Sequence, residues 1–366
     1  WDLLRQSRTK LACHPQLLNP SFSYKGKQSR RRHTVWMLDG VTVYNQVAAA
    51  LAMKPAGLAR WRRGTEDPTV WHSFARERSA NAQALQGLQQ IAPGDAVVYN
   101  GEGEVLKFKH RQRTGKRTLQ HVNDYNLIVQ QSIVTAPRAL TIERWGRSRN
   151  KLIALTFDDG PSPLHTAKVL DILARKRVQG SFFVVGAAAA MRPDLLERIY
   201  NEGHDIGNHT FTHPDLSAIS GVQLDLELNA TQRVLESKLG IHSVLFRPPF
   251  LKNIEPTTNS QANTLRASSA LGYITIGQRI DPLDWGRPGA DEIVSRTIDY
   301  TTAERGNIVL LHDGGGDRSQ TIEALPRIID DLRAKGFRFV TVHELLGLKR
   351  DDLMPRIGTQ ADYLSL

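Results

Sequence analysis

Two neighbouring carboxylates and a pair of histidines are the residues of this chain best suited to hold a metal ion. Asp158 and Asp159 stand together in Thr-Phe-Asp-Asp-Gly-Pro at the end of an apolar run, where adjacent carboxylates are costly unless something uses them. His209 and His213 are four residues apart, and the proline after His213 favours a turn over a helix there. Two imidazoles with one carboxylate form a common catalytic zinc set with a position open for water. Each motif alone also fits a structural role, since Asp-Gly-Pro suits a turn.

Three further motifs could complete a hydrolytic site. In Arg-Pro-Pro-Phe the prolines carry no N–H, so the first free backbone N–H after Arg247 belongs to Phe250 and could donate to a developing oxyanion. The alternative is a rigid turn with an exposed arginine. A fourth motif, Asp-Pro-Leu-Asp-Trp, covers residues 281–285 and ends at Trp285. By itself it is only a weak signal of function. Leu310 and His312 are two apart at a strand end and face the same side, although a histidine closing a buried strand is often a core residue.

The motifs follow apolar runs that alternate with helical patterns. This alternation predicts a parallel sheet with helices outside, and seven runs predict an α/β fold, a distorted or incompletely closed (β/α)7 barrel. Sites in such folds lie at the C-terminal ends of the strands, where the motifs stand. The predicted strands are Leu152–Phe157, Ser181–Val185, His204–Gly207, Ser243–Phe246, Tyr273–Gly277, Ile308–Leu311 and Phe337–Val342, and the predicted helices include His165–Arg175, Leu224–Leu239, Asp291–Thr302 and Ile322–Lys335.

As an ordered set, the five motifs resemble the polysaccharide deacetylase family, also called the NodB homology domain or carbohydrate esterase family four. The resemblance covers residues 150–350, and one departure is Phe250, where many relatives carry tyrosine. It implies hydrolysis of acetyl groups from N-acetylglucosamine-containing polysaccharide or chitooligosaccharide, a reaction at a carbon–nitrogen bond that is not a peptide bond. The alternatives are an O-deacetylase, such as an acetylxylan esterase, and a non-catalytic carbohydrate-binding domain.

The resemblance also implies a role for each motif residue. One divalent metal is expected, with zinc as the first choice and cobalt, nickel and manganese left open by the ligand type. The implied ligands are Asp159, His209 and His213. The other implied roles are Asp158 as general base braced by Arg247, Phe250 as oxyanion donor through its backbone N–H, His312 as general acid oriented by Asp284, and Trp285 and Leu310 as the lining of the acetyl pocket.

Residues 1–75 contain a second, shorter resemblance. Thr34–Gln46 and Gly57–Pro68 are similar to the last strand–helix–strand unit of glycoside hydrolase family eighteen barrels. The expected elements are two strands, a helix between them, and Trp61 as a sugar-stacking or core aromatic. The acidic catalytic run of that family is absent from the sequence, so we expect a truncated, chitinase-like segment without chitinase activity. The strands are expected at His33–Leu38 and Leu58–Arg62, and the helix at Thr42–Met53.

Strand-like alternation over residues 95–145 predicts a β-rich connecting segment at 76–149, and a polar stretch at 146–150 predicts a domain boundary. Residues 351–366 are expected to form a tail. Residues 1–150 hold 24 Lys and Arg against 10 Asp and Glu, a net of +14, whereas the rest holds 24 against 27, a net of −3. We interpret the basic part as a solvated surface rather than a nucleic-acid site, because no aromatic pattern accompanies it.

The single cysteine, Cys13, excludes an intrachain disulfide and a cysteine-rich zinc site. No apolar run reaches the length of a membrane helix. Because the chain begins with Trp1 and shows no leader, we expect a fragment or processed product of a larger, multi-module bacterial protein. The full-length protein is expected to be extracytoplasmic or associated with the cell envelope.

Overall fold

The protein forms two compact units in a computed structural model. The structure describes residues 1–13, 19–26, 31–58, 67–74, 82–122, 127–251 and 254–358. The first unit is Trp1–Val98 with Lys109–Thr141, and the second is Tyr99–Phe108 with Ile142–Leu366. The predicted domain at 150–350 lies wholly within the second unit, which also takes in residues from the predicted connecting segment.

All seven strands predicted for the second unit are present and lie parallel within one mixed sheet. They are β10 (Leu152–Asp158), β11 (Ser181–Val184), β12 (Asp205–Asn208), β13 (Leu245–Phe246), β14 (Ile274–Ile276), β15 (Ile308–His312) and β16 (Arg338–Val340). Six of them follow the order β15-β10-β11-β12-β13-β14, and a parallel bridge between Ile280 and Val309 links the end after β14 back to β15. The ring is distorted because β16 lies off this path and pairs only with the first half of β10.

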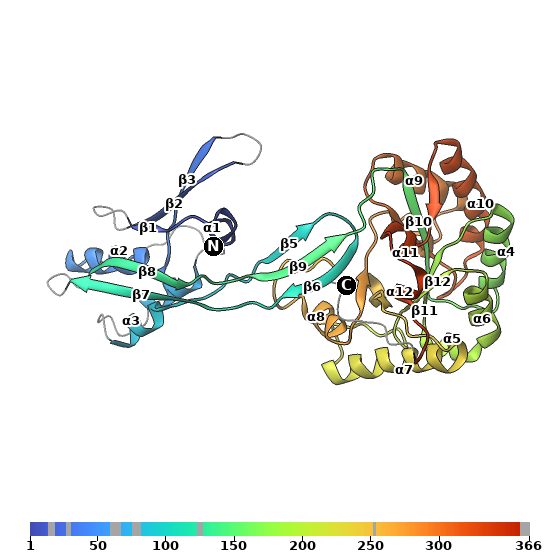
Figure 1. The fold of residues 1–366 in the computed structure, drawn as a ribbon, viewed down its shortest axis with the longest axis horizontal. Helices are drawn as coiled ribbons and strands as arrows, with labels where there is room; N and C mark the ends of the chain where they lie inside the picture. Colours follow the sequence, from blue (N-terminus) through green and yellow to red (C-terminus); the bar gives the residue numbers. More distant parts are fainter. Residues whose placement is uncertain are drawn as a thin grey trace. The chain divides into compact units, whose positions relative to one another are not determined.

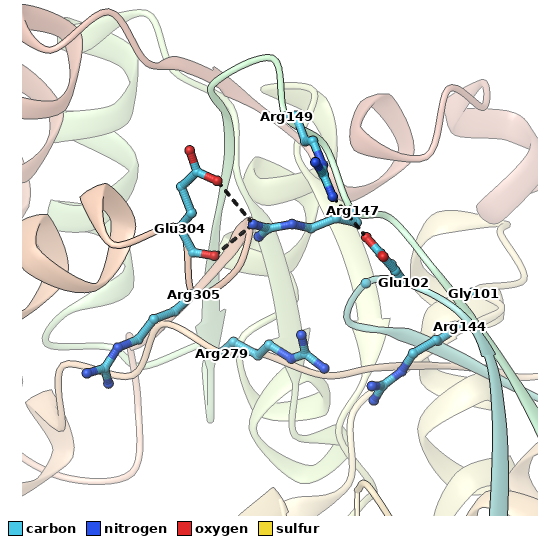
Figure 2. A pocket seen from close by; sticks show the side chains of 9 residues that line it. Gly101, Glu102, Arg144, Arg147, Arg149, Arg279, Glu304 and Arg305 are labelled. Atoms are coloured by element: carbon cyan, nitrogen blue, oxygen red, sulfur yellow. Dashed lines mark hydrogen bonds and ion pairs between the residues drawn. The ribbon is translucent and has the colours of Figure 1, made fainter. Parts of the chain in front are cut away.

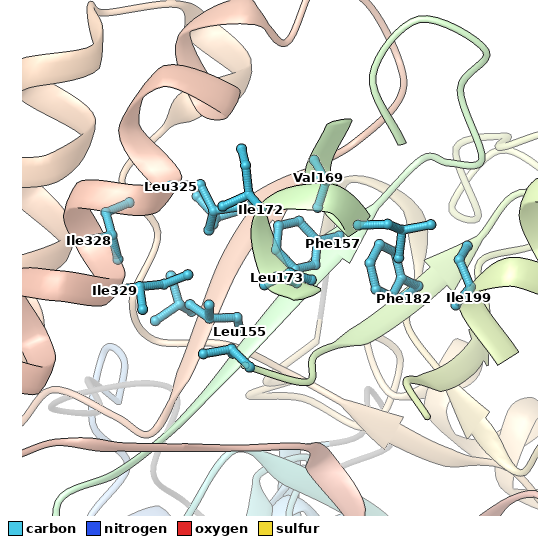
Figure 3. Packing of buried hydrophobic residues seen from close by; sticks show 14 of the residues in the cluster. Leu155, Phe157, Val169, Ile172, Leu173, Phe182, Ile199, Leu325, Ile328 and Ile329 are labelled. Atoms are coloured by element: carbon cyan, nitrogen blue, oxygen red, sulfur yellow. The ribbon is translucent and has the colours of Figure 1, made fainter. Parts of the chain in front are cut away.

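Amphipathic helices cover the outer face of these strands (Figure 1). Phe157 and Phe182, from neighbouring strands, stack with ring centroids 4.9 Å apart in the main core, where they meet helix residues such as Leu173 and Leu325 (Figure 3). Burying one such side chain contributes about 1.5–3 kcal/mol, so this core fixes the strand ends that carry the motifs. The helices are α4 (Thr166–Lys176), α5 (Gly186–Met191), α6 (Pro193–Asn201), α7 (Gly221–Leu239), α8 (Asn263–Ala270), α9 (Ala290–Thr302), α10 (Ser319–Ala334), α11 (Val342–Leu345) and α12 (Arg350–Leu353).

The sheet of the second unit continues into strands that precede the predicted domain. Strand β6 (Val105–His110) pairs antiparallel with β14, and β9 (Leu140–Trp145) and β5 (Val97–Gly101) follow it in the sheet. Glu104, which is buried, accepts hydrogen bonds from the backbone N–H groups of Asn307 and Ile308 at 2.7 and 3.2 Å. The sheet therefore depends on residues more than 40 positions before β10.

In the part of the first unit that the structure describes, the strands form two antiparallel three-stranded sheets. The predicted strand and helix appear as β3 (Arg32–Trp36) and α2 (Gly40–Ala52). Leu58 lies outside any strand, and the rest of the predicted strand, with Trp61, lies outside the described residues. The other elements are α1 (Asp2–Ser7), β1 (Ala12–Cys13), β2 (Pro20–Lys25), a 3-10 helix (Pro68–Phe74), α3 (Ala82–Leu88), β4 (Gln90–Ile91), β7 (Gly115–Val122) and β8 (Leu127–Thr135).

Candidate active site

The structure brings Asp159, His209 and His213 together after the ends of two strands. The Nε2 atoms of His209 and His213 lie 3.4 and 3.1 Å from Oδ1 of Asp159, and one ligand atom from each residue lies within 4.8 Å of the others. All three predicted ligands therefore meet at one point. Asp159 and His213 have positive φ values of 74° and 60°, a conformation that costs about 1–3 kcal/mol in a non-glycine residue and is concentrated at functional sites.

The free atoms of this cluster fit a divalent cation. Oδ1 of Asp159 is buried and has no hydrogen-bond partner, which is costly for a carboxylate oxygen without a cation. Nδ1 of His209 donates to the carbonyl of Arg247 at 2.7 Å, so its Nε2 presents a lone pair. An unpartnered carboxylate oxygen and an imidazole lone pair therefore point to one place, as the ligands of a cation do.

Asp158 lies between a buried arginine and the metal-ligand cluster. Its Oδ1 accepts a hydrogen bond of 2.7 Å from Nη1 of Arg247, and its Oδ2 lies 3.8 Å from Nε2 of His209. Arg247 is fully buried over the ring of Phe183, and it also donates to Thr156 and to two backbone carbonyls. One oxygen of Asp158 is thus held by Arg247, while the other faces the cluster of Asp159, His209 and His213.

His312 and Asp284 form a second charged pair. Nδ1 of His312 lies 2.7 Å from Oδ1 of Asp284, whose Oδ2 accepts from the backbone N–H of His312 and from the hydroxyl of Thr321. Burial lowers the pKa of His312, but Asp284, with the nearby carboxylates of Asp158 and Asp159, raises it to about 9. His312 is directly opposite Asp158 in the β10–β15 register. The imidazole is therefore protonated at neutral pH and stands on the strand next to that of Asp158.

The other three predicted site residues, Phe250, Leu310 and Trp285, differ in how far they are exposed. Phe250 has a φ of 56° after its two prolines, and its exposed ring meets that of His213 edge-on at 4.7 Å. Leu310 is buried and pairs with Thr156, two residues before His312. Trp285 is half exposed and its carbonyl accepts from Arg318. The contact between the rings of Phe250 and His213 was not predicted from the sequence.

Several residues that hold the site were missed in the sequence. Glu227, on α7, accepts from the backbone N–H groups of residues 211 and 212, between the two histidines. Asn208 binds the N–H of Thr210 and reaches the hydroxyl of Tyr273. Asp313 is buried beneath the Asp-Asp-Gly turn, and burial raises its pKa to about 7. Asn208 and Asp313 adjoin motif histidines and could have been suspected, whereas Glu227 carries no local signal.

Comparison with known proteins places these features in a family. A family model described as polysaccharide deacetylase matches residues 146–275. A peptidoglycan-N-acetylglucosamine deacetylase of Bacillus cereus is 39% identical over 206 residues, which cover 55% of this chain and 91% of the relative. A chitooligosaccharide deacetylase of Sinorhizobium fredii is 38% identical over 195 residues, which cover 50% of this chain and 87% of the relative.

Solved structures agree with the sequence comparison. A crystal structure of a peptidoglycan N-acetylglucosamine deacetylase matches with a TM-score of 0.50 and 31% identity, covering 55% of this chain and 91% of that chain. The chitin deacetylase of Colletotrichum lindemuthianum matches with a TM-score of 0.50 and 29% identity, covering 57% and 92%. Among the described residues, no helix is long and apolar enough to cross a membrane.

Proposed function

We propose, because this chain belongs to the polysaccharide deacetylase family, that its second unit hydrolyses acetyl groups from N-acetylglucosamine-containing polysaccharide or oligosaccharide. The observation that carries the proposal is the position of Asp158. One of its oxygens is bound by Arg247 at 2.7 Å, and the other faces the Asp159, His209 and His213 cluster. The substrate class is supported by the names of the relatives, which act on peptidoglycan N-acetylglucosamine and chitooligosaccharides.

Different residues of the site are proposed to hold the metal, to act as the base and to act as the acid. A divalent ion held by Asp159, His209 and His213 would supply a Lewis acid that polarises the acetyl carbonyl and favours ionisation of water. Asp158 accepts the proton of the attacking water. His312, which Asp284 keeps protonated, donates a proton to the departing amine. These residues cover the base and the acid of an amide hydrolysis.

Two further assignments complete the proposed site. The backbone N–H of Phe250, fixed by the prolines before it, is proposed to donate to the oxyanion, and Leu310 and Trp285 are proposed to line the acetyl pocket. Zinc is the proposed metal because two imidazoles and one carboxylate suit it. Cobalt, nickel and manganese share this ligand preference to different degrees, so metal content is to be measured on the purified protein.

Acetate release tests the proposed substrate class. We expect release from chitooligosaccharides, accompanied by one free amine for each acetate, and less release from acetylxylan. Asp158→Asn should lower the rate by about 100- to 10,000-fold, since general-base help is worth that much. Release from acetylxylan alone would show an O-deacetylase. Sugar binding by the wild-type chain without any acetate release, in protein loaded with metal, would show a binding domain.

For the first unit we propose an evolutionary origin and no enzymatic activity. Residues 1–75 are proposed to derive from the end of a glycoside hydrolase family eighteen-like barrel, which strand β3 followed by helix α2 supports. No chitinase activity is proposed for it. Because peptidoglycan is part of the bacterial cell envelope and one relative is a peptidoglycan-N-acetylglucosamine deacetylase, an envelope-associated location is proposed for the full-length, multi-module protein. Secretion of a reporter fused to the native gene would test this location.

A further inference from the structure

Five arginines surround one hollow in the second unit. The hollow has a volume of about 220 Å³. We call it the basic pocket, and Figure 2 shows its side chains. The lining residues are Gly101, Glu102, Gly103, Arg144, Arg147, Arg149, Arg279, Glu304 and Arg305.

The basic pocket lies away from the catalytic groups. Arg147 and Arg149 precede β10, and Glu304 and Arg305 precede β15. Asp158 and His312 stand at the opposite, C-terminal ends of these same strands. Any ligand of the basic pocket therefore does not belong to the acetyl hydrolysis described above.

The carboxylates near the basic pocket do not balance its positive charge. Arg144 and Arg279 share one oxygen of Glu255, at 2.6 and 3.2 Å. Arg147 pairs with Glu304, and Arg149 pairs with Glu102 at the exposed rim, each at 3.7 Å. The buried Glu104, beside Arg279, is a fourth carboxylate. Four carboxylates thus stand against five guanidinium groups, which leaves an excess of one positive charge when all of them are ionised.

Two arginines keep unused capacity to bind an anion. The side chain of Arg144 is only 12% exposed, and its Nε is buried without a hydrogen-bond partner. A buried donor left without a partner is costly. Among the described residues, no carboxylate pairs with Arg305, whose guanidinium lies over the ring of Tyr300 at 3.9 Å. These donors come from different segments of the chain, since Arg144 lies in β9 and Arg305 precedes β15.

We propose that the basic pocket binds a phosphate-class oxyanion. A carboxylate offers two oxygens, whereas a phosphate group offers three or four, which suits a site lined by five arginines. Arginine forks suit phosphate oxygens through paired hydrogen bonds. A second hollow of about 370 Å³ shares Arg147, Arg149 and Glu304 and adds Lys151 and Lys335, so a phosphate ester could extend its remaining part there.

Calorimetric titration of the full chain with inorganic phosphate tests the proposal, with ionic strength held constant by sodium chloride and acetate as the carboxylate comparison. We expect saturable binding of one phosphate per chain and weaker binding of acetate. The variant with both Arg279→Gln and Arg305→Gln should bind phosphate at least about ten-fold more weakly, because it loses two charge-assisted contacts. It should release acetate from the sugar substrate at the wild-type rate.

Arg333→Gln is the matched control. Arg333 lies over the ring of Phe339 at 5.9 Å, as Arg305 lies over Tyr300, but it is outside the basic pocket. We expect this variant to bind phosphate as the wild type does. An absence of saturable phosphate binding, equal binding of acetate, or an equal loss in Arg333→Gln would each overturn the proposal. The deacetylase proposal does not depend on any of these outcomes.

The source of the phosphate group can be distinguished with two probes. Binding of sn-glycerol 3-phosphate that competes with inorganic phosphate would support a soluble phosphate ester. Sedimentation with phosphatidylglycerol vesicles, but not with phosphatidylcholine vesicles, would support a lipid headgroup if inorganic phosphate and the double substitution both abolish it. Vesicle binding that neither affects would count against the basic pocket as the site.

Discussion

Replacing Asp284 by asparagine should move the alkaline limit of activity to lower pH. Asp284 is fully buried, binds Nδ1 of His312 at 2.7 Å and is the first of the groups that raise the pKa of His312 to about 9. A general acid must be protonated, so turnover falls as the pH rises through the pKa of His312. The Asp284→Asn substitution would remove the negative charge while keeping nearly the same side-chain volume.

The size of the effect follows from the two pKa values. The difference between about 6.5 and about 9 corresponds to about 3 kcal/mol in favour of the imidazolium. Without the Asp284 carboxylate the pKa should return toward 6.5 or lower, because the burial that lowers it remains. At pH 7.5 a group with a pKa of about 9 is almost fully protonated, whereas one with a pKa of about 6.5 is about one-tenth protonated, so kcat should fall about ten-fold there.

The same linkage acts on stability, with a defined sign. The raised pKa of His312 stabilises the folded protein fully below about pH 6.5, and this stabilisation is lost as the pH rises toward about 9. Asp158 and Asp159 contribute to the raised value, and a bound cation reduces their share. Wild type and variant should therefore be compared with the same metal content.

The assay is the pH dependence of kcat from acetate release, between about pH 5 and 10, on the folded and metal-loaded variant. Thr321→Val is the matched control, because it removes the hydrogen bond to Oδ2 of Asp284 and leaves the charge in place. Its alkaline limit should stay near that of the wild type. If Asp284→Asn leaves the alkaline limit where it was, then His312 is not the titrating acid or Asp284 does not set its pKa.

Three further outcomes are expected. Asp159→Asn should lose metal, whereas Asp158→Asn should keep metal and lose turnover, as measured by metal stoichiometry and acetate release; the opposite pattern would exchange the two roles. A chelator should abolish acetate release and a divalent metal should restore it, and full activity in metal-free protein would exclude the proposed site. Glu104→Ala should lower the free energy of unfolding of the second unit by about 1–3 kcal/mol for each of the Asn307 and Ile308 N–H groups left unpaired, measured by urea denaturation, and an unchanged midpoint would refute that role.

The strands and the ligands of the second unit were predictable from sequence because their signals are local. An apolar run followed by a polar motif marks the end of a parallel strand, and parallel topology brings such ends together. Asp159 and His209 lie 50 residues apart in the chain, yet both follow strand ends and meet within 3.4 Å. The predicted seven-strand count was confirmed, although the pairing of β16 with β10 was not anticipated.

The residues that were missed act over distances that leave no local pattern. Glu104 binds Asn307 across 203 positions, and nothing near Glu104 distinguishes it from a surface glutamate. Thr321 and Glu227 project from helices and read as ordinary helix residues. Strand β6 alternates like any strand, so its sequence reveals its type but not that β14, 170 residues later, is its partner. Propensity fixes an element, and only tertiary packing fixes its neighbour.

The path of the chain has a consequence for how such a protein can be recombined. The chain crosses between the two units three times, after Val98, Phe108 and Thr141. The stretch Lys109–Thr141 belongs to the first unit and interrupts the sequence of the second unit, so the two units do not simply follow one another along the chain. A gene fusion that joined a new partner at residues 146–150 would leave β6 behind and expose the edge of β14, and exposed strand edges promote aggregation. Exchange of the enzymatic unit between proteins would have to carry Tyr99–Phe108 along, with a loop closing the gap.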